Sequence, residues 1–282
     1  MSSKGNSYAL LDAGNGRKLE QFGHFLLDRP CAQAVWKPCL PEAQWQAAHA
    51  FFTREQGARW RFRQKMPESW TCEIAGIDFL LQTTDFGHVG VFPEHELAWR
   101  KAQELCVPSG AEKFSVLNLF AYSGGATLAL AKAGCEVCHL DASKKMVDWA
   151  RKNADLNSLG DAPIRWIIDD VQKFLKREIR RQRFYDGIIL DPPSFGRGSN
   201  QELFQIDSHM LDLLDLCRQV LAAQARFLFL SCHTPGYTPM VLTNLLSQVL
   251  PKGKIVAGEL ALPASRPDVM SVPSGTWALW KP

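Results

Sequence analysis

The sequence lacks the features of a membrane protein and of a secreted, disulfide-rich protein. None of its apolar runs reaches the roughly 20 residues that a membrane-spanning helix needs. Its eight cysteines are scattered over 282 residues without the spacing of a disulfide framework, which fits a reducing compartment. The first residues hold no basic segment followed by an apolar core, so we expect no secretory signal, no membrane contact and a cytoplasmic location.

The sequence is also poor in net charge and in paired metal ligands. The formal net charge is only +3, so only the position of charged residues, and not their total, can indicate a nucleic-acid partner. Cys135 and Cys138 have CxxC spacing, but no second pair accompanies them, and we expect no metal site. Hydrophobic residues make up 46% of the chain, which is enough for a sizeable core. Nothing in the sequence indicates the oligomeric state.

Residues 1–110 form a predicted β-rich region. Short apolar runs separated by turn residues predict strands here, which cover residues 8–11, 18–22, 24–27, 70–74 and 77–82. Residues 42–52 have helical spacing, with Trp45, Ala48 and Phe52 on one stripe, and predict a helix.

From residue 115 onward, apolar strands alternate with helical segments, which is typical of a parallel α/β sheet. The expected strands cover residues 115–120, 136–141, 164–168, 187–190, 226–231, 254–260 and 276–280. The expected helices cover residues 125–133, 143–157, 171–182, 201–223 and 238–250. The last strand has no long helix before it. We therefore expect an α/β fold for residues 111–282, with a Rossmann-like, seven-stranded, mostly parallel, doubly wound sheet that ends in a hairpin, and a domain boundary near residues 107–113.

The first of these strands ends in a turn of small residues, YSGG at positions 122–125, and a helix follows. Adjacent glycines suit a close approach of the backbone, and the turn exposes N–H groups at the carboxyl end of the strand. The turn lacks the G-x-G-x-x-G pattern of dinucleotide sites and the Gly-Lys-Ser/Thr ending of a P-loop. A nucleoside with a charged amino-acid tail suits it better, with Ser123 near the carboxylate and Asn118 near the ammonium.

Acidic residues end the next two predicted strands. Asp141 follows the turn by about 20 residues, where a carboxylate grips a ribose diol in nucleotide-binding α/β folds. Its alternative role is to cap the helix that starts at Ser143. Of Asp169 and Asp170, we expect one to accept a hydrogen bond from an adenine amino group and the other to cap the helix that starts at Val171.

The fourth strand ends in DPPSF, residues 191–195. The two prolines stiffen the exit from the sheet, and they leave the Asp191 carboxylate facing the crevice. Such a segment can hold a planar base by its amino edge, with Phe195 stacking on it. The alternative is a purely structural turn.

A loop rich in glycine and aromatic residues, residues 86–95, precedes a predicted helix at 94–105. It could cover a bound cofactor with His88 and Phe92. Alternatively, it is only a turn and a helix start that pack.

The segments LNLFAYSGG, HLDAS, IIDDV and DPPSFGRG match, in order, the motifs of class I S-adenosylmethionine-dependent methyltransferases. More narrowly, the chain resembles the bacterial 23S rRNA large-subunit methyltransferase family, of the 5-methylcytosine and 7-methylguanine type, although it lacks their PUA-type domain. The resemblance implies methylation of a base in RNA, with ribosomal RNA as the expected substrate and S-adenosyl-L-methionine as cofactor. The expected cofactor-binding residues are Asn118, Phe120, Tyr122, Ser123, Gly124, Gly125, Asp141, Ala142, Asp169, Asp170, Asp191, Pro192, His88 and Phe92. The expected substrate-binding residues are Pro193, Ser194, Phe195 and Arg197.

Asp191 and Cys232 are the expected catalytic residues. In 5-methylcytosine RNA methyltransferases, a cysteine at the end of the fifth strand adds to cytosine C6 as a thiolate, which makes C5 nucleophilic. Cys232 stands at that place, and its alternative role is that of a small buried core residue. Ser194 replaces the lysine of the best-known 5-methylcytosine members. If Cys232 is not the nucleophile, Asp191 and nearby carbonyls could orient an exocyclic amine or a ring nitrogen.

Two tracts concentrate positive charge. In residues 59–65, cations alternate with aromatic residues, which indicates either an RNA contact or an amphipathic strand with its arginines in water. The helix at 171–182 is strongly basic, and we expect it to present a solvated face away from the crevice. A methyltransferase for a protein or small molecule, and a non-catalytic RNA-binding protein of the same fold, are the alternative functions.

Overall fold

The computed structural model describes residues 6–55, 57–106, 114–197 and 203–282. The chain divides into two compact units, Met1–Glu96 with Ala261–Ser274, and Leu97–Leu260 with Gly275–Pro282. The boundary expected near residues 107–113 lies outside the described ranges. No helix within these ranges is both long and apolar enough to cross a membrane.

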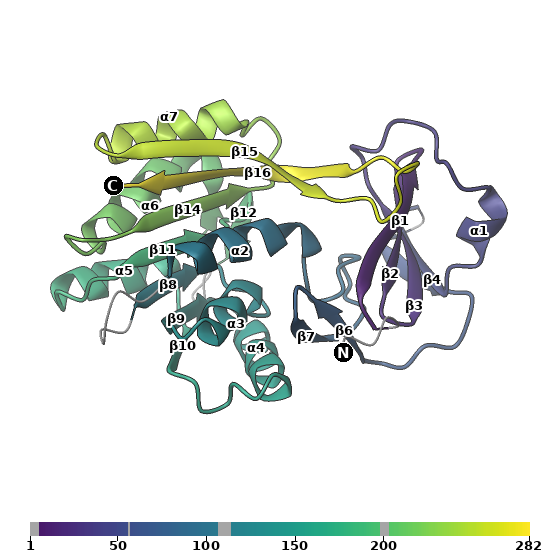
Figure 1. Ribbon diagram of the computed structural model, residues 1–282, viewed down its shortest axis with the longest axis horizontal. Helices are drawn as coiled ribbons and strands as arrows, with labels where there is room; N and C mark the ends of the chain where they lie inside the picture. Colours follow the sequence, from purple (N-terminus) through teal and green to yellow (C-terminus); the bar gives the residue numbers. More distant parts are fainter. Residues whose placement is uncertain (1–5, 56, 107–113, 198–202) are drawn as a thin grey trace. The chain divides into compact units, whose positions relative to one another are not determined.

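The first unit is built on a five-stranded sheet with the order β1-β2-β3-β4-β5 (Figure 1). Its strands are β1 (Tyr8–Gly14), β2 (Arg17–Phe22), β3 (Phe25–Pro30), β4 (Ala50–Thr53) and β5 (Arg59–Phe62). Only the β3–β4 pair is parallel. A separate hairpin, β6 (Trp70–Ile74) and β7 (Ile77–Leu81), turns at Ala75, as the sequence predicts.

The helix expected over residues 42–52 is correct only in its first half. Helix α1 covers Glu42–Gln46, and the chain then enters β4. Trp45 and Phe52 are both buried, so the apolar stripe was identified correctly. Phe52, however, is buried from a strand, in which Ala50 and Phe52 face inward and Phe51 alternates with them. Over so short a segment, apolar residues with the spacing of a helix can also fit the alternation of a strand.

Residues from the end of the chain complete the core of this unit. Leu262 and Val272 are fully buried with Leu10 in one apolar cluster. The backbone N–H and the hydroxyl of Ser265 both donate to the Leu10 carbonyl, at 3.0 and 2.6 Å. The N-terminal unit therefore depends on residues more than 250 positions away in sequence.

The second unit contains the predicted seven-stranded sheet, with the order β10-β9-β8-β11-β14-β16-β15 (Figure 1). Its strands are β8 (Ser115–Leu119), β9 (Glu136–Asp141), β10 (Ile164–Ile168), β11 (Gly187–Leu190), β14 (Phe227–Cys232), β15 (Lys254–Leu262) and β16 (Val272–Lys281). The central strands β11 and β14 are buried throughout, as continuous apolar runs in a parallel sheet should be. Strand β16 runs antiparallel to β14, so the mostly parallel fold class is confirmed.

Helices cover both faces of this sheet (Figure 1). One face carries α2 (Glu96–Leu105), α3 (Gly125–Lys132) and α4 (Lys144–Leu156), and the other carries α5 (Val171–Arg180), α6 (Ile206–Gln219) and α7 (Pro239–Val249). A 3-10 turn, Pro93–His95, precedes α2. Helix α6 starts later than expected because Leu203–Gln205 forms a short strand, β13, which pairs with β12 (Phe195–Arg197).

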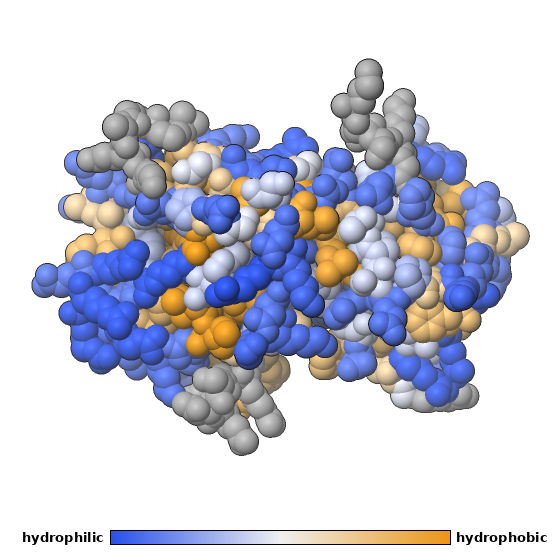
Figure 2. Space-filling view, turned by 90° about the horizontal axis from the view of Figure 1, so that it is seen from below, coloured by the Kyte–Doolittle hydropathy of each residue, from blue (hydrophilic) through white to orange (hydrophobic). Residues whose placement is uncertain are grey.

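The open edge of this sheet is partly exposed and partly covered by a cation. On the face of the molecule seen in Figure 2, hydrophilic side chains predominate and hydrophobic ones form smaller groups. Strand β10 ends the sheet, and no residue of it is fully buried. The Arg151 guanidinium lies 5.6 Å from the ring centroid of Trp166 on this strand, so a cation covers part of the apolar edge.

Candidate active site

The turn between β8 and α3 has an unusual backbone that β9 holds in place. Phe120, Tyr122 and Gly124 have φ of 56°, 50° and 94°, in the left-handed region that costs a non-glycine residue about 1 kcal/mol or more. The Ala121 N–H donates to the Leu140 carbonyl at 3.0 Å, and the Tyr122 N–H donates to Asp141 Oδ2 at 2.9 Å. The turn is therefore fixed to the carboxyl end of the neighbouring strand.

The two glycines of this turn allow three helices to meet. A Cβ on Gly125 would lie 2.3 Å from Trp99 Cζ2 of α2, which is far inside contact distance. A Cβ on Gly124 would lie 3.1 Å from the Cβ of Ala150 on α4. Glycine is therefore required here by packing behind the turn, in addition to any ligand in front of it.

The start of α3 suits a carboxylate ligand. Its N-cap, Gly124, offers no side chain to the N–H groups of the first turn. A helix N-terminus carries partial positive charge and outward N–H donors, so the α-carboxylate of an amino-acid tail fits this position. Ser123 is buried, and its carbonyl accepts a hydrogen bond from Asn153 Nδ2 at 2.9 Å.

A row of buried polar side chains lies behind the turn. Asn118 Nδ2 donates to Thr127 Oγ1 at 2.9 Å, and this hydroxyl lies 2.9 Å from His139 Nδ1. Burial lowers the pKa of His139 to about 3, so the ring is neutral and Nδ1 can accept a hydrogen bond from the Thr127 hydroxyl. The sequence had indicated neither Thr127 nor His139, although each is a polar residue inside an apolar run. The Asn118 amide is engaged in this row, and its contact with the cofactor ammonium stays a prediction.

Asp141 braces two loops rather than capping a helix. Its Oδ1 accepts from the Ser143 N–H at 2.8 Å, and its Oδ2 accepts from the Tyr122 N–H. Burial raises the pKa of this carboxyl, and the two backbone hydrogen bonds oppose that shift. Ser143 itself caps α4 by accepting from Met146 N. Asp141 and the half-buried Ala142 thus border the glycine turn, where the predicted ribose contact would be made.

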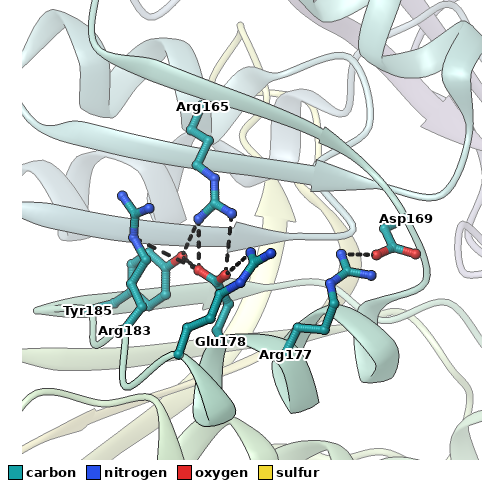
Figure 3. A network of polar contacts seen from close by, with 7 residues as sticks. Arg165, Asp169, Arg177, Glu178, Arg183 and Tyr185 are labelled. Atoms are coloured by element: carbon teal, nitrogen blue, oxygen red, sulfur yellow. Dashed lines mark hydrogen bonds and ion pairs between the residues drawn. The ribbon is translucent and has the colours of Figure 1, made fainter.

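The two acids after β10 have structural partners. Asp170 caps α5 by accepting from Lys173 N at 2.9 Å, so one of the pair does cap the helix, as expected. Asp169 forms an ion pair with Arg177, as Figure 3 shows, and its N–H donates to the Asp141 carbonyl at 3.2 Å. Contact of either carboxylate with adenine stays a prediction.

The acid of the DPPSF segment is held between β11 and β14. The buried Ser231 hydroxyl donates to Asp191 Oδ1 at 2.8 Å, and His233 Nε2 lies 3.6 Å from the same oxygen. The sequence predicted neither Ser231 nor His233 as a partner of Asp191. The sequence contained an indication of both residues, because the apolar FLFL run of β14 is followed by a segment that contains Ser231, His233 and Thr234.

The rest of this segment lies at the surface beside the loop that follows β14. Pro192 is buried, Pro193 is exposed, and Phe195 is 69% exposed. The hydroxyls of Ser194 and Thr234 are 2.7 Å apart, which joins the segment to that loop. Arg197 ends β12, and its side chain lies outside the description. Phe195 therefore combines an exposed ring with a fixed backbone.

Cys232 is the last residue of β14, and its side chain belongs to the core. It is 1% exposed and shares an apolar cluster with Ile206 and Leu242. Burial raises the pKa of its thiol, the charges of Asp191 and Asp207 act in the same direction, and hydrogen bonds with Thr234 offset this only in part. The sulfur is buried and protonated in this conformation, and its role as a nucleophile stays a prediction.

His88 and Phe92 belong to the first unit. Their ring centroids are 5.0 Å apart, in a loop closed by the Thr84 N–H donating to the His88 carbonyl at 3.0 Å. Arg29 Nη1 donates to the Gly87 carbonyl at 3.3 Å, so the loop is anchored within its own unit. Their contact with the cofactor stays a prediction.

Comparison with known proteins shows which family has this fold and this glycine turn. A family described as S-adenosylmethionine-dependent methyltransferase matches residues 44–271. The crystal structure of the SAM-dependent methyltransferase from Agrobacterium tumefaciens is 39% identical, with a TM-score of 0.93, and the match covers 100% of this chain and 92% of that chain. A methyltransferase crystallised in complex with SAH has a TM-score of 0.75 at 21% identity, covering 99% of this chain and 76% of that one, and shows the same fold.

A curated relative carries the name ribosomal RNA large subunit methyltransferase K/L, from Syntrophotalea carbinolica. It is 33% identical over 153 residues, which are 54% of this chain and 20% of that protein. A second, from Pseudomonas paraeruginosa, is 29% identical, and the match covers 22% of it. The chain therefore spans only about a fifth of the length of these relatives. The extent of the family match, the full-length agreement with a solved methyltransferase and the geometry of the glycine turn lead to one conclusion: the chain belongs to the S-adenosylmethionine-dependent methyltransferases, and S-adenosylmethionine is its cofactor.

Proposed function

We propose that the chain methylates a base of RNA, in ribosomal RNA, at a nitrogen atom that Asp191 orients. The observation that carries this proposal is the arrangement at the end of β11, where a braced carboxylate is followed by an exposed aromatic ring, Phe195. The names of the curated relatives support ribosomal RNA as the substrate.

The Asp191 segment has the chemistry to recognise a base by its amino edge. An ionised carboxylate accepts about four hydrogen bonds, and Ser231 donates one of them to Oδ1. An amino group of a base can donate another. Enzymes that act on a base hold it by hydrogen bonds to its edge and by stacking, and the 69% exposed ring of Phe195 offers a stacking surface.

When bound, S-adenosylmethionine supplies a methyl group on a positively charged sulfur. The N-terminus of α3 would hold the carboxylate end of the cofactor, and the Asp141 carboxylate would hold its ribose. Asp191 would accept a hydrogen bond from an N–H of the acceptor nitrogen and so fix the direction of its lone pair. Methyl transfer to this nitrogen would leave it with one proton too many, and Asp191 would take that proton and pass it to water. Orientation supplies most of the rate enhancement, because the methyl group needs no further activation.

The environment of Cys232 favours a nitrogen acceptor over cytosine C5. Methylation at C5 requires a thiolate that reaches C6 of the base. The Cys232 sulfur is buried in an apolar cluster, and its pKa is raised by burial and by nearby carboxylates. Attack by a nitrogen lone pair has neither requirement.

The test is methylation of ribosomal RNA from a strain lacking the gene, followed by nucleoside mass spectrometry. We expect a nucleoside methylated at nitrogen. We expect Cys232→Ala to make the same product at a similar rate and Asp191→Asn to lose activity at least 100-fold. Cys217→Ala, at another fully buried cysteine of the same core, is the matched control for stability. Formation of 5-methylcytosine that Cys232→Ala abolishes, but Cys217→Ala does not, would overturn the nitrogen assignment.

The same assay separates the alternative functions. A methyltransferase for a protein or small molecule would bind SAH but leave ribosomal RNA and ribosomal particles unmethylated. A non-catalytic RNA-binding protein would bind both SAH and RNA without transfer. Either result would overturn the RNA methylation proposed for this chain.

A further inference from the structure

Three buried polar side chains from three elements of the second unit form one row of hydrogen bonds. Asn118 of β8 is 4% exposed, and Thr127 of α3 and His139 of β9 are 0% exposed. Asn118 Nδ2 donates to Thr127 Oγ1 at 2.9 Å, and the same hydroxyl lies 2.9 Å from His139 Nδ1. Apolar side chains of similar shape could fill this space at little cost, so stability alone does not explain the row.

The hydrogen bonds of the row have one consistent direction. A hydroxyl has one proton to donate and two lone pairs that accept. Because Thr127 Oγ1 accepts from Asn118, its own proton can go to His139 Nδ1, and the proton of the imidazole is then on Nε2. Burial, and to a lesser degree the charge of Arg151, lowers the pKa of His139 to about 3, so the imidazole is neutral.

The opposite tautomer of His139 would reverse the Asn118 amide. If Nδ1 carried the proton, it would donate to Thr127 Oγ1, and the hydroxyl would then have to donate to Asn118 Oδ1. The surroundings of Nε2 disfavour this arrangement. Among the described residues Nε2 has no hydrogen-bond partner, and the Trp166 ring lies beside the imidazole, with the centroids 4.8 Å apart. An aromatic face can accept an N–H, whereas it repels a nitrogen lone pair.

The row leaves the amide oxygen of Asn118 available to a ligand. Because Nδ2 is directed at Thr127, Oδ1 points away from that hydroxyl. Within the described part of the chain, Oδ1 accepts no hydrogen bond, and it is not fully buried. Asn118 is the last residue but one of β8, at the end of the strand where open α/β sheets bind their cofactors.

The position of this oxygen suits one group of the cofactor. In S-adenosylmethionine, the α-ammonium and the α-carboxylate are attached to the same carbon atom. The carboxylate fits the N-terminus of α3, and the first turn of this helix includes Thr127. An ammonium has only N–H donors and requires acceptors. A carbonyl oxygen next to this turn can bind the ammonium, whereas an amide NH₂ group in the same place would repel it.

We propose that Thr127 and His139 are positioning residues that hold the Asn118 amide with its oxygen toward the α-ammonium of the cofactor. His139 determines the direction of the Thr127 hydroxyl, and this hydroxyl determines which end of the amide faces the cofactor. The row thereby selects a ligand that carries a cation next to its carboxylate. The inference concerns the cofactor alone and holds for any methyl acceptor, so its test is separate from that of the proposed function.

The experiment compares two ligands by calorimetry with the full chain: SAH, and an SAH analogue in which hydrogen replaces the amino group. A hydrogen bond to a charged group corresponds to about 10- to 150-fold in affinity. Thr127→Val frees the amide to reverse, so the affinity for SAH should fall about tenfold or more, and that for the analogue less than about twofold. Thr127→Ser keeps the hydroxyl and should retain the preference for SAH. The control is Thr243→Val, which removes a hydroxyl that donates to the Pro239 carbonyl in α7 and should alter neither affinity.

A measurement on the unliganded parent protein tests the same proposal without relying on the stability of Thr127→Val. Nitrogen-15 NMR of histidine-labelled protein distinguishes the protonated nitrogen of an imidazole from the one with a lone pair, and His139→Gln identifies the signals of His139. We expect a neutral ring with its proton on Nε2, and a proton on Nδ1 would overturn the proposal. Equal weakening of both ligands by Thr127→Val would indicate a structural role only and would overturn it too, as would an unchanged affinity for SAH.

Discussion

Gly125→Ala should destabilise the cofactor turn through a clash behind it. The added Cβ would lie 2.3, 2.9 and 3.1 Å from three indole atoms of Trp99, whereas ordinary carbon contacts are about 3.5–4.0 Å. Trp99 is 4% exposed, so its ring has no open space to enter. Relief requires a shift of about 1 Å in α2 or in the start of α3. Overpacking of this size costs about 1–3 kcal/mol.

The expected result has two parts. The free energy of unfolding, measured in urea, should fall by about 1–3 kcal/mol, and affinity for SAH, measured by calorimetry, should fall because the first turn of α3 moves. Trp99→Phe removes the outer atoms of the indole ring, so the double variant Gly125→Ala/Trp99→Phe should be at least as stable as Trp99→Phe alone. Gly160→Ala is the control, because its Cβ meets only the side chain of Asp155. Additive effects within about 0.5 kcal/mol in the double variant would refute the packing argument.

Three other predictions follow from carboxylates of known environment. Burial raises the pKa of Asp28 from 3.8 to about 6, and Arg17 partly offsets this shift. The fold therefore favours the protonated carboxyl. Its contribution to the free energy of unfolding is fully present below about pH 4 and is lost as the pH rises through 6. In urea unfolding, the free energy of unfolding of Asp28→Asn minus that of the parent protein should therefore rise by up to roughly 3 kcal/mol between pH 4 and pH 7. A fall of this difference over the same pH range would contradict the argument. Asp141→Asn keeps one carbonyl acceptor for two N–H donors, so it should lose one charge-assisted bond of about 1.5–3 kcal/mol and bind SAH at least tenfold more weakly by calorimetry; unchanged affinity would reject its role. Glu178→Gln replaces a fully buried carboxylate that accepts from Arg165 and Tyr185. Hydrogen bonds to a charged group are worth about 1.5–3 kcal/mol, so the free energy of unfolding in urea should fall by about that amount, and a loss below about 0.5 kcal/mol would contradict this.

The sequence predicted the second unit well because its local and global signals agree. Continuous apolar runs such as those of β11 and β14 form buried parallel strands, and their limits were predicted to within a residue or two. In the first unit, residues 50–53 fitted both a helix stripe and a strand alternation, and only pairing with β3 and β5 decides between them. Pairings of that kind join residues far apart in sequence, and local periodicity contains no information about them.

In the site, too, local sequence signals predicted some features, and only tertiary contacts decide the others. Acids that end parallel strands had to meet at one edge of the sheet, so Asp141 and Asp191 could be placed in advance. Their partners could not be predicted, because the Ser231 hydroxyl reaches Asp191 only through the register of β14 against β11. The depth of Cys232 in the core was likewise decided by the packing of α6 and α7.

The contribution of Leu262 and Val272 to the N-terminal core sets an order of events during synthesis. About 165 residues separate the two sequence segments of the first unit, and a ribosome adds about 5–20 residues per second. The emerging N-terminal strands therefore wait on the order of ten seconds or more for the hairpin that finishes their core, while the second unit is still being made. We therefore expect the N-terminal strands to need protection from aggregation during that interval, and we expect a chain that lacks β16 to lose core residues of both units.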